Sequence, residues 1–436
     1  MKLNKKVFFK IHSWIGIKLS ILFFIVCLSG TLATLSHEMD WLFNPDIRAE
    51  DNNTQVSFNE KIWNVRQKYP DGKITFWQGA VAPYLCDVVY LNIDSKRKYV
   101  FVNPYTGKVQ GETNLTVQRF LRDLHYYLFI PFQIGHFTVL IFGFMLLIST
   151  VTALLFYKKW WRKLFNLKIG KEPVVLFRSL HRLVGVWSVP FTILISITGI
   201  WYFMERANIA SISDIANTKT PKIEELKVDS ATFAQMHYTV DYDKIVHAAQ
   251  AVIPNLKVKD MLPPNTKISP VYITGKSDVP LVRNRANRVY IHPLTYEVVG
   301  VQNAESIPTV TWLNDIADPL HFGNWGGLTT KIIWFFGGLG VTFLVGTGIW
   351  ISLKRKIKNV KQAKAQQLGK WKYPNILVLL FMFGFMYYNL FSRYSINTYQ
   401  FTVISILWGL LIFLGWLIYV KKISRHKGNT STQQRL

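Results

Sequence analysis

The sequence predicts a polytopic α-helical membrane protein with two small α+β domains outside the membrane. Three observations lead to this fold class. Half of the 436 residues are hydrophobic, and six apolar runs are long enough to cross a bilayer. Positive charge is concentrated in short segments beside these runs. The first four runs and the segments between them form a duplicated unit.

The apolar runs set the order of elements along the chain. The predicted spans cover about residues 11–35, 132–157, 183–204, 331–353, 374–392 and 400–420. The first is too long for a secretory signal peptide, and no small-residue cleavage site follows it cleanly. The predicted division is a first transmembrane segment 1–43, outer domain 44–131, helix 132–157, inner loop 158–182, helix 183–204, outer domain 205–330, helix 331–353, inner loop 354–373, transmembrane hairpin 374–420 and basic tail 421–436.

The charge distribution predicts the orientation of the chain. The net charge is +26, and four short segments carry nearly all of it, namely residues 1–18, 158–182, 354–372 and 421–436. Short basic flanks mark the cytoplasmic side, so both termini are expected inside and the two long, nearly neutral segments outside. We interpret the basic segments as topology signals that also contact anionic membrane lipid, rather than as a nucleic-acid surface.

An internal repeat covers the first four spans. "HSWIG" pairs with "HRLVG" and "LSGTL" with "ITGIW" at one constant offset, which matches His12, Gly16 and Gly30 with His181, Gly185 and Gly199. Each outer domain is followed by a Leu-His pair, with His125 in "RDLHYYLF" and His321 in "ADPLHFGNW". Both copies run in the same direction, which predicts two parallel repeats related by an axis along the membrane normal. The last two spans belong to neither copy.

The outer domains are predicted to be small α+β modules, each long enough for a modest core. "EKIWNVRQKYP" and "DKIVHAAQAVIP" have helical spacing and end at proline. "CDVVYLNI" and "KRKYVFV" have the composition of strands, and "NPYTGK" that of a turn. The two cysteines, Cys27 in a span and Cys86 in the first outer domain, are not expected to form a disulfide.

These motifs resemble the PepSY-associated transmembrane family over about residues 5–355. The resemblance rests on "HSWIG…SG", "HRLVG…TG", "NPYTGKV" and "LHYYL". It implies PepSY-like outer domains in the periplasm, a bacterial inner membrane location, and kinship with iron-regulated membrane proteins and ferric-siderophore reductases that carry haem b. The second copy departs from the family pattern, since "HPLTYEV" lacks the usual glycine and "LHFGNW" is less regular.

His12 and His181 fall at the cytoplasmic ends of the first and third predicted spans. Gly16 and Gly185 follow four residues later on the same helical face, and Gly30 and Gly199 return to that face after five turns of a continuous helix. Two such stripes would offer two imidazoles to one haem iron and a groove for a porphyrin. Basic side chains for the propionates are available at Lys10, Arg178 and Arg182. In the alternative interpretation the histidines are interfacial anchors and the glycines pack helices.

A second haem near the outer face is predicted from the repeat. Its expected ligands are His125 and His321, while His37 and His136 also lie near that face and could replace or join them. Two haems, one at each face, would form a path for electrons across the membrane. His237, His247, His292 and His426 lack metal-ligand spacing and are not assigned a role.

The functional hypothesis is a haem b oxidoreductase of the inner membrane, a ferric or ferric-siderophore reductase by family resemblance. The inner loops are too short for a flavin or nicotinamide domain, so electrons would come from membrane quinol or a separate cytosolic donor. The acceptor would be a ferric siderophore or chelate. One alternative is a non-enzymatic PepSY scaffold that regulates a peptidase or a transport partner. A transporter is a further alternative, although no span has acidic residues near mid-membrane.

Overall fold

The computed structural model describes residues 4–50, 52, 54–170, 172–353 and 371–421. Most of the predicted inner loop 354–373 and basic tail 421–436, including His426, therefore lies outside the described residues. The chain divides into two compact units, which we describe separately. The helical unit is formed by residues 1–32, 122–199 and 335–436, and the sheet unit by residues 33–121 and 200–334.

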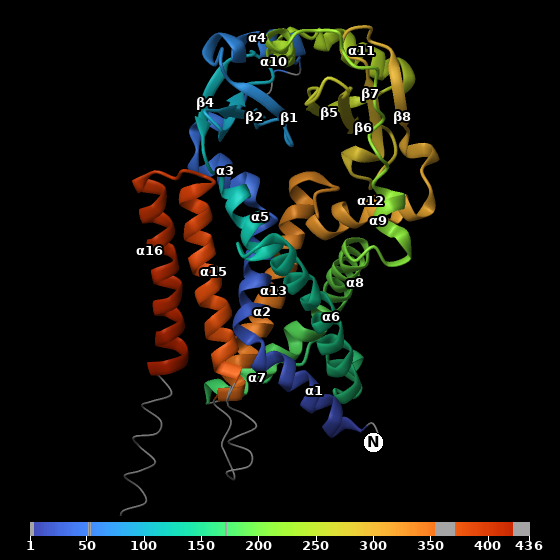
Figure 1. Cartoon of the computed structure of the whole chain (residues 1–436). Coiled ribbons are helices and arrows are strands. Elements are labelled where there is room, and N and C mark those ends of the chain that lie inside the picture. Colours follow the sequence, from blue (N-terminus) through green and yellow to red (C-terminus); the bar gives the residue numbers. More distant parts are fainter. Residues whose placement is uncertain (1–3, 51, 53, 171, 354–370, 422–436) are drawn as a thin grey trace, which may run out of the picture. The chain divides into compact units, whose positions relative to one another are not determined.

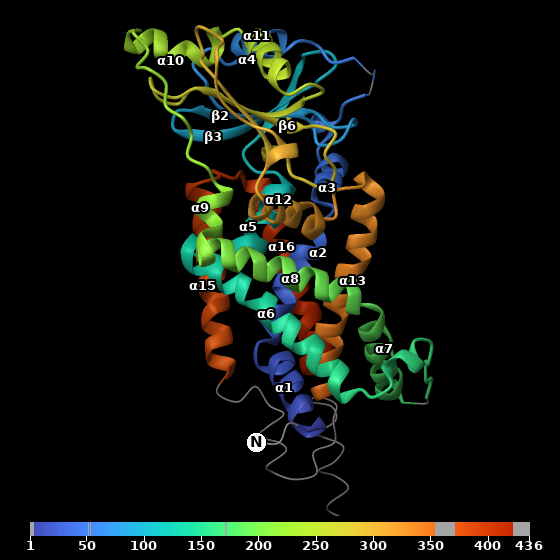
Figure 2. The same ribbon diagram turned by 90° about the vertical axis from the view of Figure 1, so that its right-hand side faces the viewer.

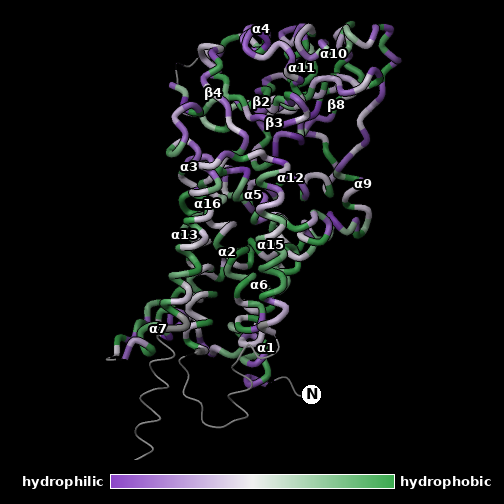
Figure 3. The backbone as a smooth tube through the Cα atoms, turned by 60° about the vertical axis from the view of Figure 1, so that its left-hand side comes forward, coloured by the Kyte–Doolittle hydropathy of each residue, from purple (hydrophilic) through white to green (hydrophobic). Residues whose placement is uncertain are grey.

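Four long apolar helices match four of the predicted spans. They are α6 (Phe132–Phe156), α13 (Gly327–Leu353), α15 (Lys372–Ser392) and α16 (Thr398–Gly415), and α16 continues into a π-helical turn, Trp416–Lys421 (Figure 1). Each is long and apolar enough to cross a membrane. These four helices are predominantly hydrophobic along their length (Figure 3).

The predicted first and third spans are not continuous helices, and this corrects the expectation from sequence. Residues 11–35 fall on α1 (Lys5–Lys18) and α2 (Ser20–Ala33), which meet at 75°. Residues 183–204 fall on α7 (Pro173–Trp187) and α8 (Val189–Arg206), which meet at 62°. If each bent pair is one span, the described residues contain six spans in all.

The two bends have different causes. Pro190 has no N–H to donate, and its ring disfavours a helical conformation of the residue before it. The backbone hydrogen bonds of the helix are therefore interrupted at Ser188, between α7 and α8. No proline lies at the first bend. There the Ser20 hydroxyl donates to the Ile17 carbonyl oxygen at 3.0 Å, and the Asn375 side-chain amide donates to the Lys18 carbonyl oxygen at 2.8 Å, so side chains satisfy carbonyls at the break.

The sheet unit contains one eight-stranded antiparallel sheet to which both predicted modules contribute. Its strand order is β4-β3-β2-β1-β5-β6-β7-β8. The strands are β1 (Lys73–Gln78), β2 (Asp87–Ile93), β3 (Lys96–Val102), β4 (Val109–Thr113), β5 (Lys257–Leu262), β6 (Val271–Lys276), β7 (Asn287–Ile291) and β8 (Val298–Gln302). The strands predicted at "CDVVYLNI" and "KRKYVFV" are confirmed as β2 and β3. The two halves join where β1 pairs with β5, with Trp77 opposite Met261.

Helices cover one face of this sheet. They are α4 (Phe58–Lys68), α10 (Ser230–Thr239) and α11 (Tyr242–Val252), which lie together above the strands in both ribbon views (Figures 1 and 2). The helices predicted at "EKIWNVRQKYP" and "DKIVHAAQAVIP" are confirmed as α4 and α11. Their N-termini cap each other, since Asp243 accepts from the Phe58 amide at 2.9 Å and Asn59 accepts from the Tyr242 amide at 2.8 Å.

The two modules share one hydrophobic core rather than having separate cores. Ile62 and Val65 of α4 and Ile245 and Ala249 of α11 belong to the same buried cluster. Shorter helices of the sheet unit carry several predicted site residues or their neighbours: α3 (Ser36–Phe43), α9 (Ile212–Ala216) and α12 (Thr309–Phe322). Helix α5 (Val117–Tyr127) spans the boundary between the units in sequence.

Candidate functional site

The rings of His12 and His181 lie next to each other in the helical unit. His12 is on α1 and His181 on α7, the N-terminal halves of the two bent pairs. Their ring centroids are 6.4 Å apart and their planes are inclined by 78°. Phe156, near the end of α6, packs edge-on against the His12 ring at 5.5 Å.

Hydrogen bonds at Nδ1 orient both rings. His12 Nδ1 lies 3.0 Å from both the carbonyl oxygen and the hydroxyl oxygen of Ser149. The carbonyl can only accept, and this contact assigns the hydrogen to Nδ1. His181 Nδ1 is 2.9 Å from the Thr347 hydroxyl oxygen. That hydroxyl already donates its hydrogen to the Phe343 carbonyl at 2.7 Å, so it accepts from His181. Each ring therefore keeps the lone pair of Nε2 for another partner.

The spacing of the pair fits two imidazoles that bind one metal from opposite sides. Metal–imidazole bonds of about 2.0 Å on each side would set the ring centroids roughly 6 Å apart, and the observed separation is 6.4 Å. The Nδ1 hydrogen bonds to oxygen acceptors are the outer contacts that orient metal-bound histidines in general. Two imidazoles supply only two ligands, so a metal held by them would need further ligands, which a macrocycle such as a porphyrin supplies.

Of the two glycines that follow these histidines, Gly16 borders open space and Gly185 faces a neighbouring side chain. A Cβ at Gly16 would meet no atom within 4 Å, and one at Gly185 would meet only Leu344 Cδ2 at 3.6 Å. Gly348 of α13 lies beside the other ring, because a Cβ there would be 3.5 Å from His181 Cε1. None of these three glycines adds a side chain beside the pair.

The predicted continuous stripe of one histidine and two glycines is wrong. The bends at Leu19 and Ser188 separate Gly30 and Gly199 from their histidines, so five turns of one helix do not connect them. Gly199 instead approaches Gly143, whose Cα would be 3.6 Å from a Cβ at position 199. Gly30 accommodates a different histidine, His125.

His125 of α5 packs directly on the backbone of α2. A Cβ at Gly30 would lie 2.6 Å from His125 Cε1. His125 Nδ1 is 3.0 Å from the Val26 carbonyl oxygen and 3.5 Å from the Ser29 hydroxyl. The carbonyl contact places the hydrogen on Nδ1, as in the inner pair. Burial lowers the pKa of His125, so its imidazole is neutral at neutral pH.

The other three predicted outer histidines have separate surroundings. His321, on α12, packs edge-on against Tyr202 at 5.3 Å between ring centroids. His136, on α6, is buried against Tyr126 at 4.1 Å. His125 and His321 belong to different units of the chain, so their pairing as ligands stays a prediction.

His37 lies beside an ion pair. The Lys331 ammonium is 2.7 Å from Glu38 Oε1, and Glu38 also accepts from the Tyr84 hydroxyl at 3.1 Å. Burial and the Lys331 charge lower the pKa of His37 to about 4. This imidazole is therefore neutral at neutral pH.

The remaining predicted residues lie at the surface or in the sheet unit. Lys10, Arg178 and Arg182 are exposed on α1 and α7, and Arg182 Nε donates to the Arg178 carbonyl at 3.1 Å. Among the histidines without an assigned role, His247 is exposed and His237 is buried with Nε2 2.9 Å from the Gly72 carbonyl oxygen.

Sequence reasoning missed Ser149 and Thr347, the two partners of the inner pair. Both lie in apolar runs, "LLISTVTALLF" and "FLVGTGIWISL", near the cytoplasmic ends of the predicted second and fourth spans. A hydroxyl side chain at the same depth as an intramembrane histidine is a signal that could have found them.

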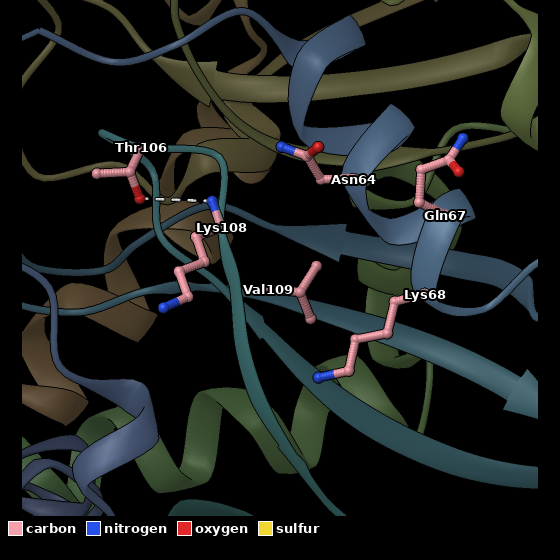
Figure 4. Close-up of a pocket in the computed structure, with 6 residues that line it drawn as sticks. All are labelled: Asn64, Gln67, Lys68, Thr106, Lys108 and Val109. Atoms are coloured by element: carbon pink, nitrogen blue, oxygen red, sulfur yellow. Dashed lines mark hydrogen bonds between the residues drawn. The ribbon is translucent and has the colours of Figure 1, made fainter.

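The described residues offer little else that resembles a metal or ligand site. Among the described residues, no group of three or more His, Cys, Asp and Glu side chains could hold a metal ion. A surface cavity of about 470 Å³ lies in the sheet unit, and Figure 4 shows its lining residues. They are Asn64, Gln67, Lys68, Thr106, Lys108 and Val109. None of them is a predicted site residue.

Comparison with known protein families shows to which family the chain belongs. The family model of the PepSY-associated TM region matches residues 9–355. The chain belongs to the PepSY-associated TM family. The match includes His12, His181, Ser149 and Thr347, and it ends before α15, so the C-terminal hairpin lies outside the PepSY-associated TM region. Comparison with curated proteins gave no significant match.

Proposed function

We propose that this membrane protein is a haem b electron-transfer protein in which His12 and His181 are the axial ligands of one haem. The observation that carries the proposal is the geometry of this pair. The rings lie 6.4 Å apart, and a hydrogen bond to oxygen holds each Nδ1. A b-type haem held by these two imidazoles would supply reversible one-electron transfer.

The residues around the pair have separate tasks in this proposal. Ser149 and Thr347 hold each imidazole in the Nδ1–H tautomer and fix the direction of Nε2. Gly16 and Gly185 leave space for a flat macrocycle on the His side of α1 and α7. The exposed Lys10, Arg178 and Arg182 offer positive charge to propionates at the membrane surface.

We further propose that His125 contributes to a second haem near the outer face, with His321, His37 or His136 as its partner. His125 has the same Nδ1–H tautomer as the inner pair, set by the Val26 carbonyl. The donor would be membrane quinol or a cytosolic protein, and the acceptor a ferric siderophore or ferric chelate. With both termini in the cytoplasm of a bacterial cell, the sheet unit would lie in the periplasm and meet that acceptor.

The test is a reduced-minus-oxidised absorbance spectrum of the detergent-purified protein, with haem quantified per chain. We expect b-type bands in the wild type. His12→Ala and His181→Ala should each lose the same part of the haem, because one ligand alone does not make a six-coordinate site. His247→Ala is the matched control, because His247 is an exposed histidine on α11 and should leave the spectrum unchanged.

Two results would overturn the proposal. Full haem content in the His12→Ala/His181→Ala double variant would show that these two histidines are not the haem ligands. A colourless wild type from cells supplied with haem would leave the scaffold interpretation, in which the PepSY modules regulate a peptidase or transport partner, as the leading one.

A further inference from the structure

We infer that the C-terminal hairpin, α15 with α16, is a brace that fixes the helices carrying His12 and His125. The ligand part of this inference rests on the proposed function, whereas the brace itself does not. The hairpin lies outside the residues matched by the family, and polar side chains near both ends of α15 bond to the rest of the helical unit. We call these places the inner anchor, at Asn375, and the outer anchor, at Tyr394.

The inner anchor holds the end of α1. Asn375 is buried in the first turn of α15, and its side-chain amide donates to the Lys18 carbonyl oxygen at 2.8 Å. Lys18 is the last residue of α1, where the helical ladder ends before the 75° bend. A carbonyl at such a break needs a donor from elsewhere when water is excluded. Trp371 adds an edge-on ring contact with Trp14 at 5.4 Å.

The inner anchor therefore bears on His12. Trp14 and Lys18 lie two and six residues after His12 on the same helix, and both contact the start of α15. The direction in which α1 leaves the bend determines where His12 meets His181. Asn375 contacts neither histidine, so it acts through the position of α1.

The outer anchor holds α5 through a buried carboxylate. The side chain of Asp123 is fully buried, two residues before His125. It accepts hydrogen bonds from Tyr394, in the loop between α15 and α16, and from Tyr127 at 2.7 Å. Arg393 donates to the Tyr127 hydroxyl at 3.3 Å, which ties the same loop to α5 a second time. A buried carboxylate depends on such donors, so the loop stabilises this end of α5.

The chain after α5 is held by the hairpin as well. Leu128 and Phe129 both adopt left-handed backbone conformations, with φ of 55° and 57°. Non-glycine residues take this conformation where surrounding contacts determine it. Asn389 of α15 donates to the Phe129 carbonyl oxygen at 3.3 Å. The turn that leads from α5 into α6 is therefore fixed by the same brace.

The test compares Tyr394→Phe and Asn375→Leu with a control inside the hairpin, Tyr399→Phe. Tyr399 is 76% exposed on α16. The first readout is backbone hydrogen exchange of the full-length protein, followed by mass spectrometry. We expect several-fold faster exchange at residues 117–131 in Tyr394→Phe and at residues 11–22 in Asn375→Leu, with no change in Tyr399→Phe. These variants test the two anchors independently, so poor folding of one leaves the other decisive.

The second readout is spectroscopic. Asn375→Leu is expected to shift the reduction potential and absorbance bands of the haem that depends on His12, and Tyr394→Phe those of the haem that depends on His125. Faster exchange in a protein without haem would support the brace and defeat the proposed function. Wild-type exchange and unshifted bands in both variants would overturn the brace while the haem proposal stands.

Discussion

The contact between Gly30 and His125 gives a prediction that needs no bound group. A Cβ at position 30 would lie 2.6 Å from His125 Cε1 and 2.9 Å from Nδ1. Ordinary contacts between such atoms are about 3.5–4.0 Å, so Gly30→Ala must push the imidazole away by about 1 Å. This movement breaks the 3.0 Å hydrogen bond from Nδ1–H to the Val26 carbonyl.

The size of the effect follows from three contributions. Overpacking costs about 1–3 kcal/mol, and the lost hydrogen bond costs about 0.5–1.5 kcal/mol. Replacing glycine by alanine inside a helix returns up to about 1 kcal/mol. Together these contributions lower the free energy of unfolding of Gly30→Ala by about 0.5–4.5 kcal/mol, with a central value of about 2 kcal/mol. The measurement is unfolding in mixed detergent micelles with a rising fraction of denaturing detergent.

The repeat supplies the control. A Cβ at Gly199 would meet only the Gly143 Cα at 3.6 Å, so Gly199→Ala should be neutral or stabilising. A double-mutant cycle assigns the cost to the imidazole, because Gly30→Ala should cost little in a His125→Ala background. Equal destabilisation by Gly30→Ala and Gly199→Ala, or a cost unchanged by removal of His125, would refute the reasoning.

Three further predictions follow from other described residues. The Asp40 carboxyl group accepts hydrogen bonds from the first amides of α5, and its burial raises its pKa to about 6. The folded protein therefore holds this proton more tightly than the unfolded chain, so the free energy of unfolding should fall as pH rises from about 4 to 6 and then level off. Unfolding measured across pH 4–7 should lose this slope in Asp40→Asn, and a retained slope would exclude Asp40 as its source. Thr347→Val removes the hydroxyl that accepts from His181 Nδ1–H, so the imidazole donates less electron density to the iron. The ferric form is then less stabilised, and redox titration should show a higher reduction potential of the haem. Ser149→Ala removes a hydroxyl contact with His12 but keeps the carbonyl acceptor, so it should shift the potential less than Thr347→Val, and equal shifts would count against the assignment. Burial and neighbouring carboxylates raise the pKa of the Cys86 thiol to about 12, so thiol labelling followed by peptide mapping should be slow until the protein unfolds. Fast labelling of the folded protein would contradict its burial.

The sequence predicts the helices that form the spans because a long apolar run needs only local information. The four straight spans agree with their runs to within a few residues, except that α16 gives way to a π-helical turn. The bends are harder to predict. Pro190 is a visible signal for the second bend, whereas the first has no proline and involves Ser20 and an amide from Asn375, far along the chain.

The same distinction applies to the sheet and the site. Individual strands such as β2 and β3 are visible as short β-rich runs, but the pairing of β1 with β5 joins segments about 180 residues apart and no local pattern specifies it. The duplication draws attention to His12 and His181, and the structure places their rings next to each other, while their role as ligands stays a prediction. It could not predict that Ser149 and Thr347 hold them, because those contacts depend on how separate helices pack.

The most direct test of the central claim is low-temperature electron paramagnetic resonance of the oxidised, purified protein. Axial imidazoles from His12 and His181 predict a low-spin ferric signal, strongly anisotropic because the ring planes are inclined by 78°. This signal should be lost from the spectrum of the His12→Ala/His181→Ala double variant and persist in His247→Ala, whatever signal a second haem at His125 adds. A high-spin ferric signal in the wild type, or a low-spin spectrum that is unchanged by the double substitution, would contradict the account.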